Sequence, residues 1–268
     1  MKIIITENQY IKLFEHKDYK LFSLTEKQIK NMDKELLMKI LYKHRNKNIG
    51  PLLYKIINRF TGNYKTPKEW FENKEYKTFM EYFKRKISKQ KMFEIKKQTK
   101  NEMSLPCECV IESKGNLNAL SSIVRLKKPT KDVISDLKKL KVENVENLSF
   151  INMKLLKIFY HRIHSPISGK ISKIIEVSPK DNFFGENNLW ILEIKNKTYG
   201  NVYLILVGEL SIQDFTFKVD VGDQVKMFEE IGNFNWASQV LILFDKDKFD
   251  KEVKLKKNGK YFMGDPVF

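Results

Sequence analysis

The chain has 268 residues, of which 42% are hydrophobic, so it can bury a sizeable core and is not disordered as a whole. Its 50 Lys and Arg residues outnumber its 33 Asp and Glu residues, and the net charge of +17 favours an anionic partner, either nucleic acid or an anionic lipid surface. The two cysteines, Cys107 and Cys109, are too few for a structural zinc site, so we expect no metal and a reducing compartment.

The sequence contains no apparent segment for crossing a membrane. No apolar run approaches the roughly 20 residues that a spanning helix needs, and the run within residues 1–6 is too short for the core of a signal peptide. We therefore expect a cytoplasmic protein that is soluble or peripherally associated with a membrane. The positive charge comes mostly from lysine and is spread along the chain, without a recognisable base-reading module, so we expect no nucleic-acid partner.

Signals of helices dominate residues 1–95. Capping boxes, in which a Thr is followed three residues later by Glu or Gln, begin at Thr25, Thr66 and Thr78, and Pro51 suits the first position of another helix. We therefore expect four helices, followed by a charged connector over 89–100. Their basic amphipathic character fits either apolar stripes packed on a downstream domain or helices at a membrane surface, and both can hold for different helices.

Beyond residue 100 the pattern changes to short strands separated by glycine turns, with one short helix over 129–140. We expect strands over 107–113, 117–126, 150–159, 169–177, 189–194, 202–207, 215–219, 225–231, 240–244 and 252–262. Because β-α-β alternation is absent, the predicted fold class is α+β. It consists of an antiparallel β-rich domain over 96–268, with barrel-like or sandwich-like layers, after the helical region over 1–95.

Two stretches carry groups that could do chemistry. In residues 232–244 a turn glycine leads to Ala237 and Ser238, and the apolar run that follows is typical of a buried strand. A second stretch holds two of the four histidines, His161 and His164, next to a turn proline. An Ala-Ser pair before a buried strand is by itself more typical of packing. A serine becomes a useful nucleophile when a base takes its proton, and a histidine oriented by a carboxylate is the usual base.

Taken in order, several motifs resemble those of the phosphatidylserine decarboxylase proenzymes. Residues 160–169 read Tyr-His-Arg-x-His-x-Pro-x-x-Gly, and residues 221–234 contain Val-Gly-Asp-x-Val and then Glu-Glu-Ile-Gly-x-Phe. The Ala-Ser pair at 237–238 precedes Val-Leu-Ile-Leu-Phe, and Thr78–Lys86 is similar to the family's helix upstream of the catalytic domain. The resemblance covers about residues 76–268, and the ordered set is far more specific than any one motif.

In that family a serine cleaves its own chain and becomes a pyruvoyl group, which is a covalent cofactor. The resemblance assigns this role to Ser238 and cleavage to the Ala237–Ser238 bond, which gives a large chain and a small chain. Ser238 Oγ would attack the Ala237 carbonyl to form an ester, which eliminates to dehydroalanine and then hydrolyses to the pyruvoyl group. The family's Asp-His-Ser triad implies His164 as the base and Glu108 as its orienting group, since residues 105–108 are similar to the Ser-Pro-x-Asp segment. The second histidine, His161, is implied in decarboxylation.

The resemblance implies a lyase of phospholipid biosynthesis that converts phosphatidylserine to phosphatidylethanolamine and CO2 at a membrane surface. The pyruvoyl carbonyl would form a Schiff base with the substrate amine and accept electrons as CO2 departs. Two alternatives stay open, namely a pyruvoyl-dependent decarboxylase of a free amino acid and a catalytically impaired, lipid-binding homologue. A homodimer also stays open.

The sequence departs from the family pattern at three positions that bear on self-cleavage. Glu108 replaces the usual Asp and is one methylene longer, and Phe159 stands where an Asp is common. Ala237 replaces a Gly and restricts the backbone at the cleavage site. Next to the histidines, we expect Tyr160 to pack and Arg162 to form a structural ion pair.

Overall fold

The computed structural model describes residues 37, 41–48, 56, 67–72, 75–98, 102–117, 130–156, 158–178, 188–208, 215–235, 238–249 and 252–268. The chain divides into two compact units, residues 1–91 and 92–268, and each is described by itself. Within those described ranges, no helix combines the length and the apolar character that crossing a bilayer requires.

The first unit contains the helix predicted at Thr78. This helix, α5 (Phe79–Phe83), begins at a complete capping box. Glu81 N donates to Thr78 Oγ at 3.1 Å, and Thr78 N donates to the Glu81 carboxylate at 3.2 Å. Phe79 and Phe83 are fully buried. The capping residues therefore set the start of α5, and the apolar pair holds its inner face.

The other predicted helices of this unit lie mainly outside the described residues. Isolated described positions of the first two, such as Leu37 and Ile56, are helical and buried. Thr66 is outside the described residues, and the segment that follows it forms a single 3₁₀ turn, η2 (Lys68–Trp70).

The charged connector predicted over 89–100 was wrong, because residues Lys89–Gln98 form the helix α6. Lys, Gln, Met and Glu all have high helix propensity, and this preference outweighs the weak apolar periodicity. Lys91 N donates to Ser88 Oγ at 3.2 Å, so Ser88 caps the first turn. Ile95, only 8% exposed, anchors the helix.

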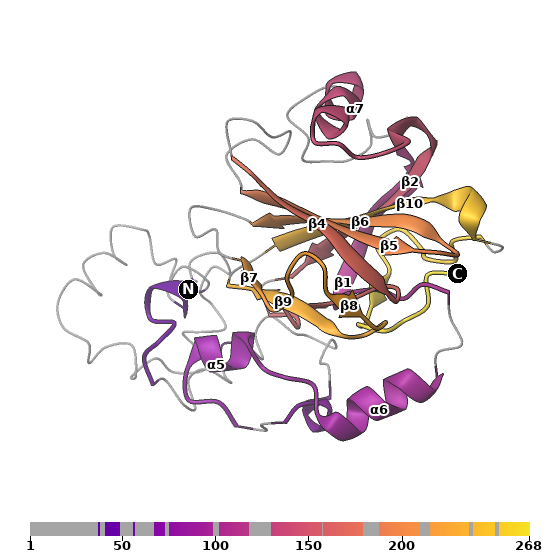
Figure 1. Ribbon diagram of the computed structural model, residues 1–268. Helices are drawn as coiled ribbons and strands as arrows, with labels where there is room; N and C mark the ends of the chain where they lie inside the picture. The colour runs from indigo at the N-terminus through magenta and orange to yellow at the C-terminus, as the bar shows by residue number, and fades with distance from the viewer. Residues whose placement is uncertain are drawn as a thin grey trace. The chain divides into compact units, whose positions relative to one another are not determined.

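The second unit is built on an eight-stranded antiparallel sheet in the order β11-β1-β2-β10-β6-β5-β4-β8 (Figure 1). Its strands are β1 (Cys109–Asn116), β2 (Leu148–Leu155), β4 (Gly169–Val177), β5 (Leu189–Asn196), β6 (Gly200–Gly208), β8 (Gln224–Val225), β10 (Ser238–Asp245) and β11 (Lys260–Tyr261). A three-stranded antiparallel sheet has the order β3-β9-β7, with β3 (Arg162–His164), β7 (Phe215–Phe217) and β9 (Glu230–Phe234). The predicted α+β class with antiparallel layers is confirmed.

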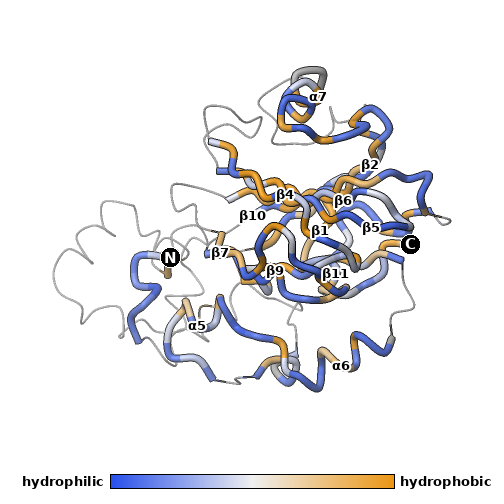
Figure 2. The backbone as a smooth tube through the Cα atoms, viewed as in Figure 1, coloured by the Kyte–Doolittle hydropathy of each residue, from blue (hydrophilic) through white to orange (hydrophobic). Residues whose placement is uncertain are grey.

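The large sheet is the middle layer of this unit, and both of its faces are buried. Along β10, Val240 and Ile242 belong to a core shared with the small sheet, which contributes Phe215 and Phe234. Leu241, on the opposite face, belongs to a second core under helix α7 (Thr130–Lys139) and the 3₁₀ turn η4 (Val145–Asn147). Apolar residues accordingly concentrate in the strands of the large sheet (Figure 2). This double burial explains why β10 reads as a nearly continuous apolar run.

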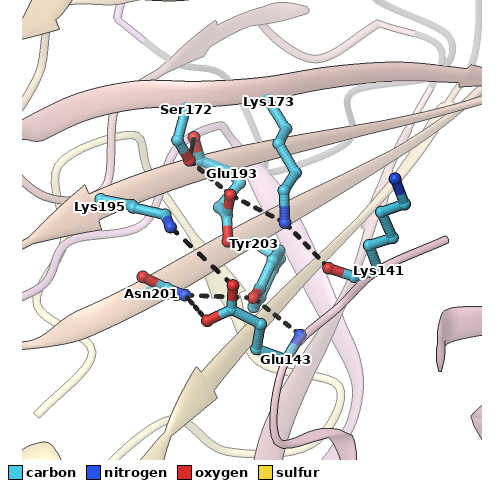
Figure 3. A network of polar contacts seen from close by, with 8 residues as sticks. All are labelled: Lys141, Glu143, Ser172, Lys173, Glu193, Lys195, Asn201 and Tyr203. Carbon is cyan, nitrogen blue, oxygen red and sulfur yellow. Dashed lines mark hydrogen bonds and ion pairs between the residues drawn. The ribbon is translucent and has the colours of Figure 1, made fainter.

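The core face under α7 also holds a polar network (Figure 3). Glu193 on β5 is fully buried and lies directly across the β5–β6 ladder from Tyr203. Lys173 Nζ lies 3.3 Å from Glu193 Oε2 and donates to the Lys141 carbonyl at 2.9 Å. Glu143 N donates to the Tyr203 hydroxyl at 3.0 Å. These contacts fasten the segment between α7 and η4 to the sheet.

Two strand predictions need correction, whereas α7 and most strands occur where they were expected. The strand predicted over 225–231 is two strands, β8 and β9, separated by a turn in which Phe228 has φ 70°. The strand predicted over 252–262 is reduced to β11, because a turn precedes it and Asn258 has φ 61°. Such left-handed residues break a ladder. The strand predicted over 117–126 lies outside the described residues except for Leu117.

Candidate active site

Ser238 is the first residue of β10, a strand with neighbours on both sides. It pairs with Leu155 on β2 and with Gly208 on β6, and it is 3% exposed. Because side chains alternate along a strand, Ser238 shares the face of Val240, toward the small sheet. Within the described part of the chain, Ser238 Oγ has no hydrogen-bond partner. Ala237 lies outside the described residues, and so does the predicted cleavage geometry.

The histidine run is brought to the same end of β10 by two connections. β2 ends at Leu155, opposite Ser238, and the chain then leads into the histidine run. Phe234 N donates to the His161 carbonyl at 3.1 Å, and Ser238 follows Phe234 by four residues. Since an extended chain spans at most about 3.5 Å per residue, Ser238 lies within roughly 14 Å of Phe234. The fold therefore gathers Ser238 and the histidines in one region.

The segment that carries Glu108 runs alongside the histidine run. Ser104 N donates to the Pro166 carbonyl at 3.0 Å, and His164 N donates to the Pro106 carbonyl at 2.8 Å. Tyr160 N donates to Glu108 Oε2 at 2.8 Å. Glu108 is 5% exposed, so its carboxylate is buried beside the residue that precedes His161. The structure thus brings Glu108 to the histidine run, although Glu108 and Tyr160 are 52 positions apart in the sequence.

Main-chain carbonyls define the tautomers of both histidines. His164 Nδ1 lies 2.8 Å from the Phe228 carbonyl oxygen, and His161 Nδ1 lies 2.7 Å from the Phe159 carbonyl oxygen. A carbonyl can only accept, so each Nδ1 carries the proton, and in the neutral ring the lone pair is on Nε2. Sequence reasoning missed the carbonyl of Phe228, because a main-chain acceptor leaves no residue signature. The orienting role of Glu108 stays a prediction.

Burial lowers the pKa of His164 to about 4. The Phe228 carbonyl and Glu230 act in the opposite direction, whereas the charges of Arg162 and Lys218 add to the lowering. His164 is 3% exposed and is uncharged at neutral pH. A neutral imidazole with its lone pair on Nε2 is the form that a general base requires.

Tyr160 has a larger role than the packing that was expected. Its ring packs at 3% exposure and stacks on His164, with centroids 5.7 Å apart and an interplanar angle of 23°. Its hydroxyl also lies 2.8 Å from His164 Nε2. Because that nitrogen holds the lone pair, the hydroxyl is the donor. A tyrosine four residues before a histidine does not reveal this contact, which depends on the path of the backbone from Tyr160 into β3.

The expected ion pair of Arg162 is present. Arg162 Nη1 contacts Glu230 Oε1, and Lys218 Nζ lies 2.8 Å from Glu230 Oε2. Burial alone would raise the pKa of Glu230, but Lys218 and Arg162 hold it below its usual value. The pair joins β3 to β9 and so fixes the strand that ends at His164.

Cys107 and Cys109 are free thiols, and both are fully buried. Burial raises the pKa of the Cys109 thiol well above its usual value, so it stays protonated and acts as a small apolar side chain. In the ranges that the structure describes, no three His, Cys, Asp or Glu side chains are placed to hold a metal ion together.

Comparison with known proteins gives a consistent result. The family model described as phosphatidylserine decarboxylase matches residues 79–268. Phosphatidylserine decarboxylase proenzyme 2 of Komagataella phaffii is 26% identical over 204 residues, covering 69% of this chain but 20% of that protein. The phosphatidylserine decarboxylase proenzyme of Bacillus subtilis is 25% identical over 130 residues, covering 44% of this chain and 49% of the relative.

A further relative matches along most of both chains. The phosphatidylserine decarboxylase proenzyme of Anoxybacillus flavithermus is 30% identical over 209 residues, which are 72% of this chain and 77% of the relative. This chain therefore spans a small part of the fungal relative and most of this bacterial one. Since the family model covers well over half of the sequence, the chain belongs to the phosphatidylserine decarboxylase family.

Proposed function

We propose that this chain cleaves itself at Ser238 and then decarboxylates phosphatidylserine to phosphatidylethanolamine and CO2. The observation that carries the proposal is the buried Ser238 hydroxyl at the start of β10, at the end of the sheet where the fold gathers His161, His164 and Glu108. The names of the relatives and the family match support the substrate. We assign catalysis to residues 96–268, with residues 1–95 as a helical region upstream of it.

Self-cleavage needs a base for the Ser238 hydroxyl. In the proposed step Ser238 Oγ attacks the Ala237 carbonyl, and His164 takes the hydroxyl proton at Nε2. The neutral state of His164 and the lone pair on that atom support this assignment. The Tyr160 hydroxyl has to release Nε2 for the transfer, because a neutral imidazole has one lone pair.

The residues around Ser238 fit a pyruvoyl group formed from it. The side chain is buried, has no hydrogen-bond partner within the described ranges, and stands on a strand with neighbours on both sides. When formed, the group supplies an electron sink for the pair released as CO2 leaves. We assign to His161, fully buried and held at Nδ1 by the Phe159 carbonyl, the proton that the substrate carbon takes up.

The substrate is presented by a membrane, and the charge of the chain supports an anionic surface as the partner. The net charge is +17, and lysine supplies most of the cations. Juxtamembrane lysines are attracted to anionic headgroups by about 1 kcal/mol each. We therefore place the protein at the membrane periphery, where phosphatidylserine is available as a substrate.

Intact-mass measurement of the purified chain tests self-cleavage. We expect two fragments, with the small one comprising residues 238–268 and carrying the mass of a pyruvoyl terminus. Ser238→Ala should give only the full-length mass. Ser149→Ala is the matched control, since Ser149 is also buried but pairs with Phe244 at the other end of β10. A wild-type chain that stays intact after long incubation with lipid vesicles contradicts the proposal.

Release of CO2 identifies the substrate. Phosphatidylserine in vesicles and free amino acids, each labelled at the carboxyl carbon, should be compared with the same processed protein. Release from the vesicles alone supports the proposal. Release from a free amino acid alone favours the soluble-substrate alternative, and vesicle binding without cleavage favours the impaired, lipid-binding homologue.

A further inference from the structure

A chain of polar side chains, two of them buried, lies behind Ser238, on the opposite face of the large sheet. Ser238 faces the small sheet, whereas the next residue, Gln239, shares the face of Leu241 under α7. Gln239 is 4% exposed, and Asn152 on β2 is fully buried. Gln239 Nε2 donates to Asn152 Oδ1 at 2.5 Å. Gln239, the second residue after the predicted scissile bond, is therefore held by its side chain as well as by the strand ladder.

The contact continues from β2 to β1. Asn152 Nδ2 donates to Glu112 Oε2 at 3.3 Å, and Glu112 Oε1 lies 3.9 Å from Lys154 Nζ. A carboxylate only accepts, so Glu112 fixes which end of the Asn152 amide faces it. The Asn152 oxygen is then left to accept from Gln239. Glu112, Asn152 and Gln239 form one directed chain across three neighbouring strands, which we call the amide chain.

The amide chain matters because of where the backbone is proposed to be cut. Cleavage before Ser238 removes the covalent connection at the start of β10. Among the described residues, the restraints at this end then include the ladder pairing of Ser238 and Gln239 with β2 and β6 and the side-chain contact of Gln239. Strand ends fray, and a buried hydrogen bond opposes fraying because opening it leaves polar groups unsatisfied.

We propose that Gln239 and Asn152 are positioning residues, which hold the start of β10 so that the reacting group at position 238 stays in place. The proposal rests on the proposed function of Ser238. Neither side chain faces the small sheet, so both act through the strand and not by touching substrate. A displacement of about 1 Å at a reacting group can cost up to a hundredfold in rate.

Gln239→Met tests the first contact, because methionine has similar length and no amide. We expect the rate of self-cleavage and the kcat for decarboxylation each to fall about tenfold, with KM changed less than twofold. Gln224→Met on the edge strand β8 is the matched control, since Gln224 is exposed, and it should leave all three values unchanged. A Gln239→Met protein with wild-type cleavage and kcat overturns the proposal.

A charge-swapped pair tests the amide chain itself. Asn152→Asp places a second carboxylate next to Glu112 and should lower kcat at least as much as Gln239→Met. Adding Glu112→Gln restores the chain, because the new amide at position 112 donates to the new carboxylate at 152, which still accepts from Gln239. We expect the double variant to return to within about threefold of wild type. A double variant as impaired as Asn152→Asp alone argues against a role for the amide chain.

Hydrogen exchange separates this proposal from the function on which it rests. In the Ser238→Ala background, where no cleavage occurs, Gln239→Met should speed amide exchange at 238–240 about tenfold and leave 243–245 unchanged. Unchanged exchange at 238–240 overturns the positioning role whether or not the wild-type chain is an enzyme. Failure of the wild-type chain to cleave overturns the proposed function alone.

Discussion

The two faces of the large sheet use a similar set of polar residues in opposite ways. Under α7, the buried Glu193 faces the cation of Lys173, and the Tyr203 hydroxyl accepts from Glu143 N (Figure 3). On the side of the small sheet, the buried Glu108 accepts from a main-chain amide, and the Tyr160 hydroxyl donates to His164. The first arrangement joins a loop to the sheet, whereas the second surrounds an imidazole.

The comparison shows that one face of the sheet carries structural contacts, whereas the other carries the groups that we propose for catalysis. Under α7 the carboxylate is balanced by a cation, and burial raises the pKa of Tyr203 to about 12, so the phenol stays protonated. On the other face, main-chain groups hold the histidines at Nδ1, and His164 remains uncharged. The Phe228 carbonyl offsets only part of the lowering of the His164 pKa by burial, so this main-chain contact orients the base and leaves it neutral.

The largest expected effect is on the rate of self-cleavage, which should depend on the histidine face of the large sheet and not on the face under α7. His164→Ala should slow self-cleavage by about 10²- to 10⁴-fold, because a positioned general base contributes that much. Tyr203→Phe removes a buried hydroxyl from the other face and should leave the rate unchanged. The fraction of cleaved chain, followed by intact mass over time, checks both variants. Equal rates for His164→Ala and wild type would remove His164 from the mechanism.

The second effect concerns stability and belongs to the α7 face. Lys173→Met leaves the fully buried Glu193 without its cation and should lower the free energy of unfolding by about 3 kcal/mol. Adding Glu193→Gln should recover most of the loss, since the buried charge is then removed. Urea unfolding in the Ser238→Ala background provides the measurement. A loss that persists in the double variant would indicate that the ion pair does not carry the effect.

The third effect is a pH dependence that belongs to the histidine face. The folded pKa of His164, about 4, is below the ordinary value of 6.5, so the unfolded chain binds this proton first. Above about pH 6.5 His164 is neutral in both the folded and the unfolded chain, so it does not affect the free energy of unfolding. As the pH drops to about 4, the free energy of unfolding should fall by about 3 kcal/mol. The difference between Ser238→Ala and Ser238→Ala/His164→Gln in pH-dependent urea unfolding isolates this contribution. Parallel curves would contradict it.

The smallest effect refines the role of Tyr160. The hydroxyl donates to the neutral form of His164, so Tyr160→Phe should raise the pKa of His164 by roughly one unit. An NMR titration of the imidazole in the Ser238→Ala chain measures the shift. Tyr203→Phe serves again as the control and should not move it. A lower or unchanged pKa in Tyr160→Phe means that the hydroxyl does not bind Nε2.

Much of the second unit could be predicted because its residues report burial. β10 faces two cores and reads as an apolar run, and α7 carries an amphipathic pattern with matching helix signals. α6 was missed because its charged residues were taken as a connector, although the same residues are strong helix formers. The residue types indicated the site candidates. The prediction that these residues lie together came from the family resemblance.

The partners of the site could not be predicted for a physical reason. The Phe228 carbonyl that meets His164 is a main-chain group, and its direction follows from φ 70° at a residue where sequence rules expect glycine. The contact between Gln239 and Asn152 depends on the register of β10 against β2, which no local pattern encodes. Contacts that depend on register or on backbone direction become visible only in the folded chain.

The central place of β10 has a consequence for the proposed two-chain product. The strand pairs with β2 and β6 along its length, and the C-terminal Val267 and Phe268 belong to the same core. A fragment interwoven in this way cannot depart while the rest stays folded, so separating the two pieces amounts to denaturing the protein. Each molecule would thus be matured once, as a unit, and its short piece could not be exchanged for that of another copy.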